Sequence, residues 1–177
     1  MPNYIRNRIK GGCYFFTVNL LERHQNHLLI EQIDLLRNVV RQVKHKYPFH
    51  IDGWVVLPEH MHFMFTLPQG DDDYATKIRP IKTLFSKNLP KTERRSTVRQ
   101  KRGERGIWQR RFWEHSIRDE SDYKAHMDYL HNNPVKHSHV EQVKDWSYST
   151  FHHLIKCQVY PENWGGNIVE FEAGERF

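Results

Sequence analysis

Residues 49–67, FHIDGWVVLPEHMHFMFTL, decide the fold of this 177-residue chain. Residues 49–56 are rich in aromatic and β-branched side chains, which predicts a strand. Residues 60–67 alternate polar and apolar side chains and predict a second strand. Only Leu57-Pro58-Glu59 lies between them, so the two strands follow each other through a tight connection without a helix.

Helical patterns flank this pair of strands on both sides. Apolar side chains recur at helical spacing over residues 29–47, which Pro48 ends, and again over about 74–89, where Pro80 could shift the start. The other expected elements are a first strand over 13–20, a fourth strand over 107–118, a third helix over 121–133 and a last short helix near 147–157. Asp119 or Ser121 would cap the third helix, and Asn133-Pro134 would end it.

The order is strand, helix, strand, strand, helix, strand, helix, which is typical of a split βαβ pattern. We therefore predict an α+β, ferredoxin-like sandwich with an antiparallel sheet and its helices on one face. The length suits a single domain over residues 1–177. Residues 90–106 hold many charges and almost no large apolar side chain, so we expect an exposed, mobile loop there. A C-terminal extension with an irregular tail would span about 147–177.

The composition is basic, with 27 lysines and arginines against 21 acidic residues and a formal net charge of +6. This balance favours a polyanionic partner such as nucleic acid, although a basic protein without such a partner would look the same. Two cysteines are too few for a disulfide scaffold. There is no signal-peptide pattern and no apolar run near the roughly 18 residues of a membrane span, so we expect a soluble, cytoplasmic protein without a membrane partner.

The positive charge is concentrated in residues 77–111. This segment holds thirteen lysines or arginines and two glutamates, a charge of +11, so the rest of the chain carries −5. Such a segment could contact DNA phosphates, or it could be a solvated loop without a partner. Trp108 and its aromatic neighbours could stack on unpaired bases, and Arg110 and Arg111 flank a strand that would fix them. The candidate DNA-binding residues are Lys82, Lys87, Arg94, Arg95, Arg99, Lys101, Arg102, Arg105, Trp108, Arg110 and Arg111.

His60 and His62 are separated by one residue in a predicted strand. Strand side chains alternate faces, so both imidazoles point the same way and could begin a metal site. The chain has thirteen histidines, so a close pair can also arise by chance. This pair lies at the start of an otherwise apolar strand. Burying a histidine without a role in the core would cost free energy, so the position favours the metal interpretation.

Tyr129 and Asn133 lie four residues apart in the third predicted helix and therefore share a face, with their Cβ atoms about 6 Å apart. A phenol is a poor nucleophile at neutral pH, because its pKa is about 10. A nearby cation would stabilise the phenolate and polarise a phosphoryl oxygen. The alternative is that Tyr129 is a core aromatic residue and Asn133 a C-terminal cap of the helix.

Several stretches resemble the single-tyrosine HUH transposases. Residues 57–62, LPEHMH, resemble their His-hydrophobic-His motif, and residues 129–136, YLHNNPVK, resemble their tyrosine helix. Residues 108–115, WQRRFWEH, and 146–150, WSYST, are similar to one bacterial branch, the REP-associated tyrosine transposases. The resemblance covers about residues 13–156, and the motifs occur in the family's order.

The resemblance implies a metal-dependent enzyme that nicks single-stranded DNA and transfers the strand through a 5′-phosphotyrosine intermediate. Tyr129 would be the catalytic nucleophile, and His60, His62 and Asn133 would hold Mg²⁺ or Mn²⁺. Asn133 stands where the family has an amide-bearing ligand. Because Pro134 follows it, its carbonyl would reach the metal from a loosened last turn of the helix.

The implied partner is hairpin single-stranded DNA of the REP type, with a short guide sequence at its foot. Relatives from insertion sequences work as dimers that share the tyrosine helix, whereas the REP-associated branch resembles monomers. We therefore expect a monomer, with a dimer as the alternative, acting on the bacterial nucleoid. Two other functions stay open: a hairpin-binding protein that has lost catalysis, and a metal-dependent hydrolase of a small substrate that uses Glu59 or Glu114.

Overall fold

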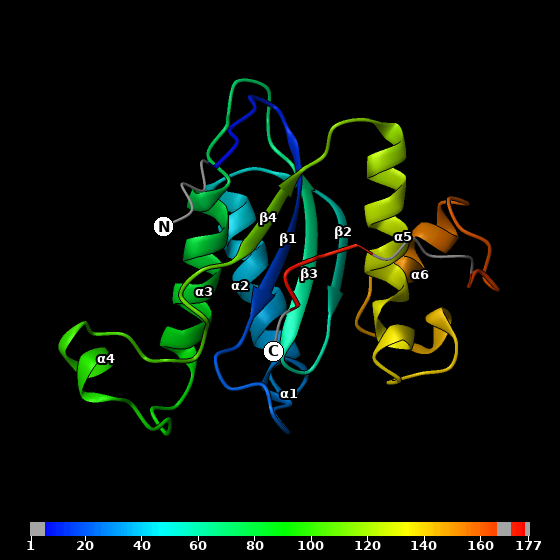
Figure 1. Ribbon diagram of the computed structural model, residues 1–177. Helices are drawn as coiled ribbons and strands as arrows, with labels where there is room; N and C mark the ends of the chain where they lie inside the picture. The colour runs from blue at the N-terminus through cyan, green and yellow to red at the C-terminus, as the bar shows by residue number, and fades with distance from the viewer. Residues whose placement is uncertain (1–5, 166–170, 176–177) are drawn as a thin grey trace.

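A four-stranded antiparallel sheet forms the centre of the computed structural model, which describes residues 6–165 and 171–175 (Figure 1). The strands are β1 (Cys13–Asn19), β2 (His50–Val56), β3 (His60–Thr66) and β4 (Trp113–Ser116), in the spatial order β2-β3-β1-β4. All neighbouring strands pair antiparallel, and β1 and β3 pair over their whole length. This is the ferredoxin-like arrangement that the order of elements predicted.

Helices connect the strands and extend the chain beyond them. They are α1 (Leu28–Glu31), α2 (Ile33–Lys46), α3 (Ala75–Asn88), α4 (Thr97–Lys101), α5 (Glu120–Lys136) and α6 (Phe151–Lys156), with a 3-10 turn η1 (Val143–Asp145) before α6. The first helical pattern is thus split in two at Gln32, and Pro80 lies inside α3 without moving its start.

Helices cover both faces of the sheet, which corrects the expectation that they lie on one. α2 and α3 lie on one face, and α5 lies on the other, against β2 and β3 (Figure 1). The cause is visible in β1, where Tyr14 and Phe16 join the core under α2 and α3 while Phe15 joins the core under α5. A strand whose large apolar side chains point to both faces of the sheet is buried on both sides.

The helix α5 continues through Pro134 to Lys136, whereas the sequence predicted an end at Asn133. Asp119 caps its start, as expected, by accepting a 2.8 Å hydrogen bond from the backbone N–H of Asp122. Pro134 removes only one backbone donor so near the end, and the N–H of His137 still reaches Asn133 O at 3.0 Å. α5 is the longest described helix at 17 residues, and none of the described helices is long and apolar enough to cross a membrane.

The strand β4 is much shorter than residues 107–118. The backbone turns toward α3 before the strand begins, and the carbonyls of Gln109 and Arg110 accept hydrogen bonds from Lys82 Nζ. Before β4, an isolated bridge between Leu20 and Trp108 continues the pairing with β1.

Residues 146–150 lie along the outer edge of β2. Ser149 pairs with Val55 in an isolated bridge, the N–H of Val56 donates to Tyr148 O at 2.9 Å, and Trp146 Nε1 donates to Val56 O at 2.9 Å. These bonds fasten the C-terminal extension to the sheet and place η1 beside α5.

The approach of α5 to the sheet depends on β2. A bulge between Ile51 and Gly53 leaves Asp52 as an extra residue, and its carboxylate accepts a 3.0 Å hydrogen bond from Tyr123 Oη of α5. A Cβ atom at Gly53 would lie 2.8 Å from Met127 Sδ, closer than real Cβ atoms come. The bulge and the glycine therefore set the height of α5, and with it the height of Tyr129, above the sheet.

We expect Gly53→Val to push α5 away from the sheet and to lower the free energy of unfolding by about 1–3 kcal/mol, the usual cost of overpacking a buried position. Urea unfolding measures this change. Gly165→Val is the matched control, because a Cβ there meets no atom within 4 Å. An unchanged unfolding free energy for the Gly53 variant would show that Met127 simply moves aside.

Candidate active site

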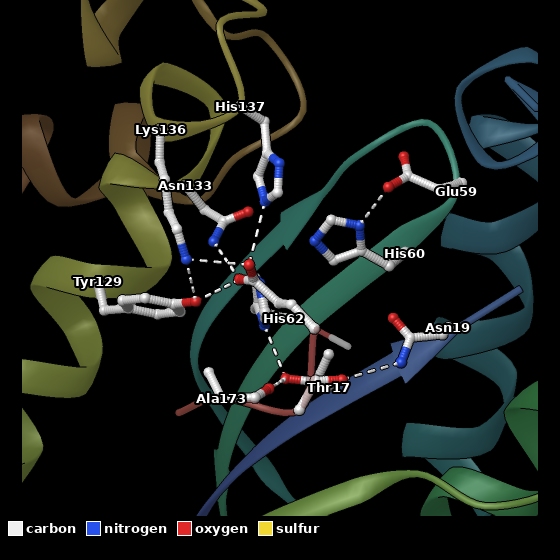
Figure 2. A network of polar contacts seen from close by, with 12 residues as sticks. Thr17, Asn19, Glu59, His60, His62, Tyr129, Asn133, Lys136, His137 and Ala173 are labelled. Carbon is white, nitrogen blue, oxygen red and sulfur yellow. Dashed lines mark hydrogen bonds and ion pairs between the residues drawn. The ribbon is translucent and has the colours of Figure 1, made fainter. Parts of the chain in front are cut away.

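The histidine pair opens β3 on the face that α5 covers (Figure 2). His60 and His62 are both fully buried, and their ring centroids lie 5.0 Å apart. Met61 between them joins the core on the opposite face, as the alternation of a strand requires. The two imidazoles therefore point the same way, as predicted.

Glu59 and Arg23 hold His60 in place. Glu59 Oε1 lies 2.8 Å from His60 Nδ1 and 3.1 Å from Arg23 Nη2. Burial alone would raise the pKa of Glu59, but the hydrogen bonds with His60 and Arg23 outweigh it and lower the pKa to about 2, so the carboxylate stays ionised. An ionised acceptor at Nδ1 leaves the lone pair on Nε2, which is buried with no hydrogen-bond partner among the described residues.

His62 is held from the neighbouring strand by Thr17, whose Oγ1 lies 2.9 Å from His62 Nδ1. The other ring nitrogen, Nε2, faces the centre of the site, 2.8 Å from Glu175 Oε1. Burial is the main cause that lowers the pKa of His62 to about 4, so the ring is neutral near neutral pH. Neutral imidazole is the form that binds a metal ion.

The helix α5 brings Tyr129 and Asn133 to the same place. Both are buried, and the ring centroid of Tyr129 lies 5.5 Å from that of His62. Asn133 Nδ2 donates a 2.7 Å hydrogen bond to Glu175 Oε1, while Asn133 Oδ1 is buried without a partner in the described part of the chain. Asn133 reaches the site from within a regular helix, which corrects the expectation of a loosened last turn.

These residues fit a divalent metal ion. Two imidazole nitrogens and one amide oxygen face the same space, and two of the three atoms, His60 Nε2 and Asn133 Oδ1, are buried polar atoms without a described partner. Such atoms cost free energy, which a bound cation would remove. Three protein ligands would leave positions for the oxygens of a substrate.

The carboxylate of Glu175, in the C-terminal segment, lies at the centre of the site between β3 and α5. Five side chains contact its carboxylate, namely His62, Asn133 and Tyr129 at Oε1 and Lys136 and His137 at Oε2. Burial alone would raise the pKa of Glu175, but the hydrogen bonds from His137 and His62 outweigh it and hold the pKa well below its usual range. Glu175 is therefore held as an anion among these side chains.

Three consecutive carbonyls hold the tail against the sheet. Thr17 Oγ1 donates to Ala173 O, Asn19 Nδ2 donates to Gly174 O at 3.3 Å, and Arg23 Nη1 donates to Glu175 O at 3.2 Å. Gly174 has a φ of +70°, and a Cβ atom there would overlap with Trp113. Only glycine lets the tail lie this close to β4.

The sequence interpretation missed Lys136, His137 and Glu175. Lys136 lies seven residues after Tyr129 on the same helix face, but this spacing is informative only if the helix continues past Pro134. Glu175 lies in an irregular segment, 42 residues after Asn133, and no spacing rule connects it to the site. Glu114, a carboxylate considered for a hydrolase, binds Tyr74 Oη at 3.1 Å on the α3 side of the sheet.

The segment 90–106, expected to be an exposed, mobile loop, is mostly exposed but is not irregular throughout. It contains α4, and Arg105 closes its base with all five N–H donors. The guanidinium binds both carboxylate oxygens of Glu93 at 2.6 Å and the carbonyl oxygens of Ser86, Leu89 and Pro90. These hydrogen bonds lower the pKa of Glu93 to about 2 and leave Arg105 no N–H for a DNA phosphate.

Lys82 and Trp108 are also engaged inside the protein. Lys82 Nζ donates to Gln109 O at 2.8 Å and to Arg110 O at 3.1 Å, and burial lowers its pKa to about 8. Trp108 is 9% exposed, contacts Phe85 edge-on and donates its Nε1 to Lys82 O. Two of the candidate DNA-binding residues therefore position the segment instead of facing a ligand.

Most other basic candidates surround an open groove of about 1180 Å³ between α3, α4 and residues 103–111. Lys87, Arg95, Arg99, Arg110 and Arg111 line it, Arg94 lines the hollow beside it, and Lys101 and Arg102 are exposed at the end of α4. The helices α3 and α4 that border this groove lie across the sheet from α5 (Figure 1). The backbone bonds from Leu21 N to Ile107 O and from Gln109 N to Asn19 O join the wall of the groove to the end of β1 beside the tail.

This fold and site define the class that the sequence resembles, the single-tyrosine transposases. The family described as Transposase IS200 like matches residues 12–133, and the chain belongs to this family. Cutting DNA and transferring the strand is the activity of the family, so the chain is an enzyme that acts on DNA.

The chain is similar to REP-associated tyrosine transposases over its whole length. It is 47% identical over 176 residues to the one of Escherichia coli (strain K12), which covers 99% of this chain and 98% of that protein. A relative from Haemophilus influenzae, which carries the same name provisionally, is 49% identical over 94% of this chain and 95% of its own length. A solved structure of a REP-associated tyrosine transposase bound to a REP hairpin matches with a TM-score of 0.86, at 47% identity, over 100% of this chain and 99% of that one.

We expect a substrate phosphate to need the contacts that Glu175 occupies, so weakening the tail should speed DNA cleavage. Gly174→Ala would force the tail away from Trp113 without removing any polar side chain of the site. We expect the rate of single-turnover cleavage of a hairpin single strand to rise about tenfold or more. A coupling free energy of a few kcal/mol between the tail and the substrate gives an effect of this size. Amide exchange of residues 171–175 reports whether the tail has left.

Gly165→Ala is the control for this prediction, because it lies in open space near the same end of the chain. A Gly174→Ala protein whose tail exchanges faster but which cleaves at the parent rate would show that Glu175 does not compete with the substrate.

Proposed function

We propose that this enzyme nicks a single DNA strand at the foot of a REP-like hairpin and rejoins it through a 5′-phosphotyrosine at Tyr129. The observation that carries the proposal is the convergence of His62, Asn133 and Tyr129 on one oxygen of Glu175. That oxygen is a stand-in for an oxygen of the scissile phosphate. The choice of a REP-like hairpin is supported by the similarity to a transposase described with a REP hairpin.

We assign His60, His62 and Asn133 as the ligands of Mg²⁺ or Mn²⁺. When bound, the ion would supply positive charge that polarises the scissile phosphate. Glu59 orients His60, Thr17 orients His62, and the regular turn of α5 orients Asn133. Such supporting hydrogen bonds fix the ring orientation and raise the basicity of the ligand atoms.

In the nicking step, a bond forms between Tyr129 Oη and the scissile phosphorus, and the bond from phosphorus to the 3′ oxygen breaks. The phenol loses its proton and the departing 3′ oxygen gains one, which leaves a 5′-phosphotyrosine and a free 3′-OH. The number of phosphoester bonds is unchanged. Attack by a 3′-OH on the phosphotyrosine can therefore rejoin a strand without an energy source, which hydrolysis by water would not allow.

We propose that the hairpin lies along the basic groove. The contacts would come from Lys87, Arg94, Arg95, Arg99, Lys101, Arg102, Arg110 and Arg111, and they would supply affinity that falls as salt rises. Backbone bonds join residues 107–109 of the groove wall to the end of β1, where Asn19 also holds the tail, so the groove wall and the tail meet at one strand end.

We propose that the enzyme is a single-domain monomer that acts on the nucleoid in the cytoplasm. His60, His62, Tyr129 and Asn133 all come from one chain, and α5 lies on its own sheet, so a second copy is not needed to complete the site. The proposed DNA partner places the enzyme with the chromosome.

Tyr129→Phe tests the nucleophile. We expect the covalent protein–DNA adduct, formed with a hairpin single strand in Mn²⁺ and located by peptide mass, to disappear completely, because phenylalanine has no oxygen to attack the phosphate. Tyr47→Phe, at the end of α2 on the other face of the sheet, is the control and should still form the adduct. If the Tyr129→Phe protein still cleaves the strand, the nucleophile is another group.

Glu59→Gln should weaken Mn²⁺ binding about 10- to 100-fold, the usual effect of losing the carboxylate behind a ligating histidine. Titration calorimetry on the protein without DNA measures the affinity directly. Glu141→Gln, at an exposed position, should leave it unchanged. Equal affinities for parent and Glu59→Gln would mean that His60 is not a ligand or does not depend on Glu59.

A further inference from the structure

The carboxylate of Glu175 shows how the site holds an anion with two oxygens. Its Oε1 faces the residues assigned above to the metal and to the nucleophile. Its Oε2 lies against different groups, 3.0 Å from Lys136 Nζ and 3.2 Å from His137 Nε2. A scissile phosphate also has two non-bridging oxygens. The site therefore offers a second oxygen-binding position beside the first, and the reaction described so far does not use it.

Lys136 also contacts the nucleophile. Its Nζ donates a 2.8 Å hydrogen bond to Tyr129 Oη and lies 4.7 Å from the centroid of the Tyr129 ring. One ammonium group thus touches both the attacking oxygen and the anion beside it. Tyr129, Asn133 and Lys136 are spaced by four and three residues and share one face of α5, because the helix continues past Pro134.

We propose that Lys136 is a catalytic residue that holds Tyr129 Oη and binds one non-bridging oxygen of the scissile phosphate, with His137 as the second donor to that oxygen. The inference rests on the proposed function, because the role belongs to the phosphotyrosine reaction. Negative charge develops on the phosphate oxygens as the phenol attacks. An ammonium group already in place stabilises that charge without reorganisation, and its two contacts align the reactants.

The competing explanation is that Lys136 only holds the tail closed through its ion pair with Glu175. The two roles predict opposite changes in the cleavage rate when the charge of Lys136 is removed. If Lys136 only holds the tail, removing its charge opens the site and cleavage rises. If Lys136 acts on the phosphate, removing its charge lowers cleavage, and it does so even when the carboxylate of Glu175 is already gone.

The test compares Lys136→Met in the parent chain with the same change combined with Glu175→Ala. Single-turnover cleavage and hairpin Kd are measured for each protein in Mn²⁺. We expect cleavage to fall about 100-fold in the Glu175→Ala background, the loss seen when one preorganised donor to a transition-state oxygen is removed. In the parent chain the fall should be smaller, because losing the ion pair with Glu175 also loosens the tail. The Kd should change far less, because the other basic residues still bind the hairpin.

Two further variants control for folding and charge. Lys136→Arg keeps the positive charge and should recover part of the rate. Lys124→Met is the matched control on the same helix, because Lys124 is exposed and pairs with Asp128, away from the site. Thermal unfolding shows that each variant is folded, and if Lys136→Met is not, Lys136→Gln takes its place in both backgrounds.

Sulfur substitution adds a readout that a structural role would not move. A phosphorothioate replaces one non-bridging oxygen of the scissile phosphate by sulfur. The parent enzyme should cleave one diastereomer more slowly, the one whose sulfur faces Lys136. In Lys136→Met, most of the rate difference between the two diastereomers should disappear. Cleavage that rises in Lys136→Met, or that is unaffected by it in the Glu175→Ala background, would overturn the proposal. The proposed function fails separately, if the Tyr129→Phe protein still forms an adduct.

Discussion

The site depends on a buried set of polar atoms between β3 and α5. His60 Nε2 and Asn133 Oδ1 face the same space without a described partner, and they cannot satisfy each other because both are acceptors. The surroundings are organised around this constraint. Glu59 and Thr17 take the outer ring nitrogens, and Gly53 lets the helix come close enough for the amide to reach the histidines. The tail carboxylate accepts hydrogen bonds from the donors of the site, such as Asn133 Nδ2, but it leaves these two acceptors without a described partner. A metal ion would satisfy both of them.

The parts of the structure that follow from local periodicity could be predicted from the sequence. The alternation of residues 60–67 placed both imidazoles on one face, and the four-residue spacing on α5 placed Tyr129 with Asn133. The end of α5 could not be predicted in this way, because the local rule for the residue before a proline is outweighed by burial of Pro134 and by hydrogen bonds beyond it. The position of Glu175 was beyond any local rule, since its segment is held by side chains more than 150 residues away in the sequence.

Counting charges in the sequence overstated how much of the basic segment is free for DNA. Lys77 is buried against Asp71, Lys82 binds two carbonyls, and Arg105 binds Glu93 and three carbonyls. A lysine or arginine near chain reversals often serves as a donor for carbonyls that no helix or strand satisfies. Sequence composition cannot separate such structural cations from exposed ones, because the difference lies in the position of distant backbone oxygens. The exposed cations of residues 87–111 are nevertheless gathered around one groove, across the sheet from the helix that carries the tyrosine.

The closure of residues 90–104 by Arg105 has a consequence for how the enzyme can diverge. Because the Arg105 guanidinium holds the two ends of the segment together, residues 90–104 depend little on packing against the core. Their large aliphatic side chain, Val98, is 57% exposed. Insertions, deletions and charge changes there leave the histidine pair and α5 untouched. Under the proposed binding mode, variation in this segment would alter the recognition of DNA while the chemistry stays fixed. The same separation makes this segment the natural place to graft a new binding preference onto an unchanged catalytic centre.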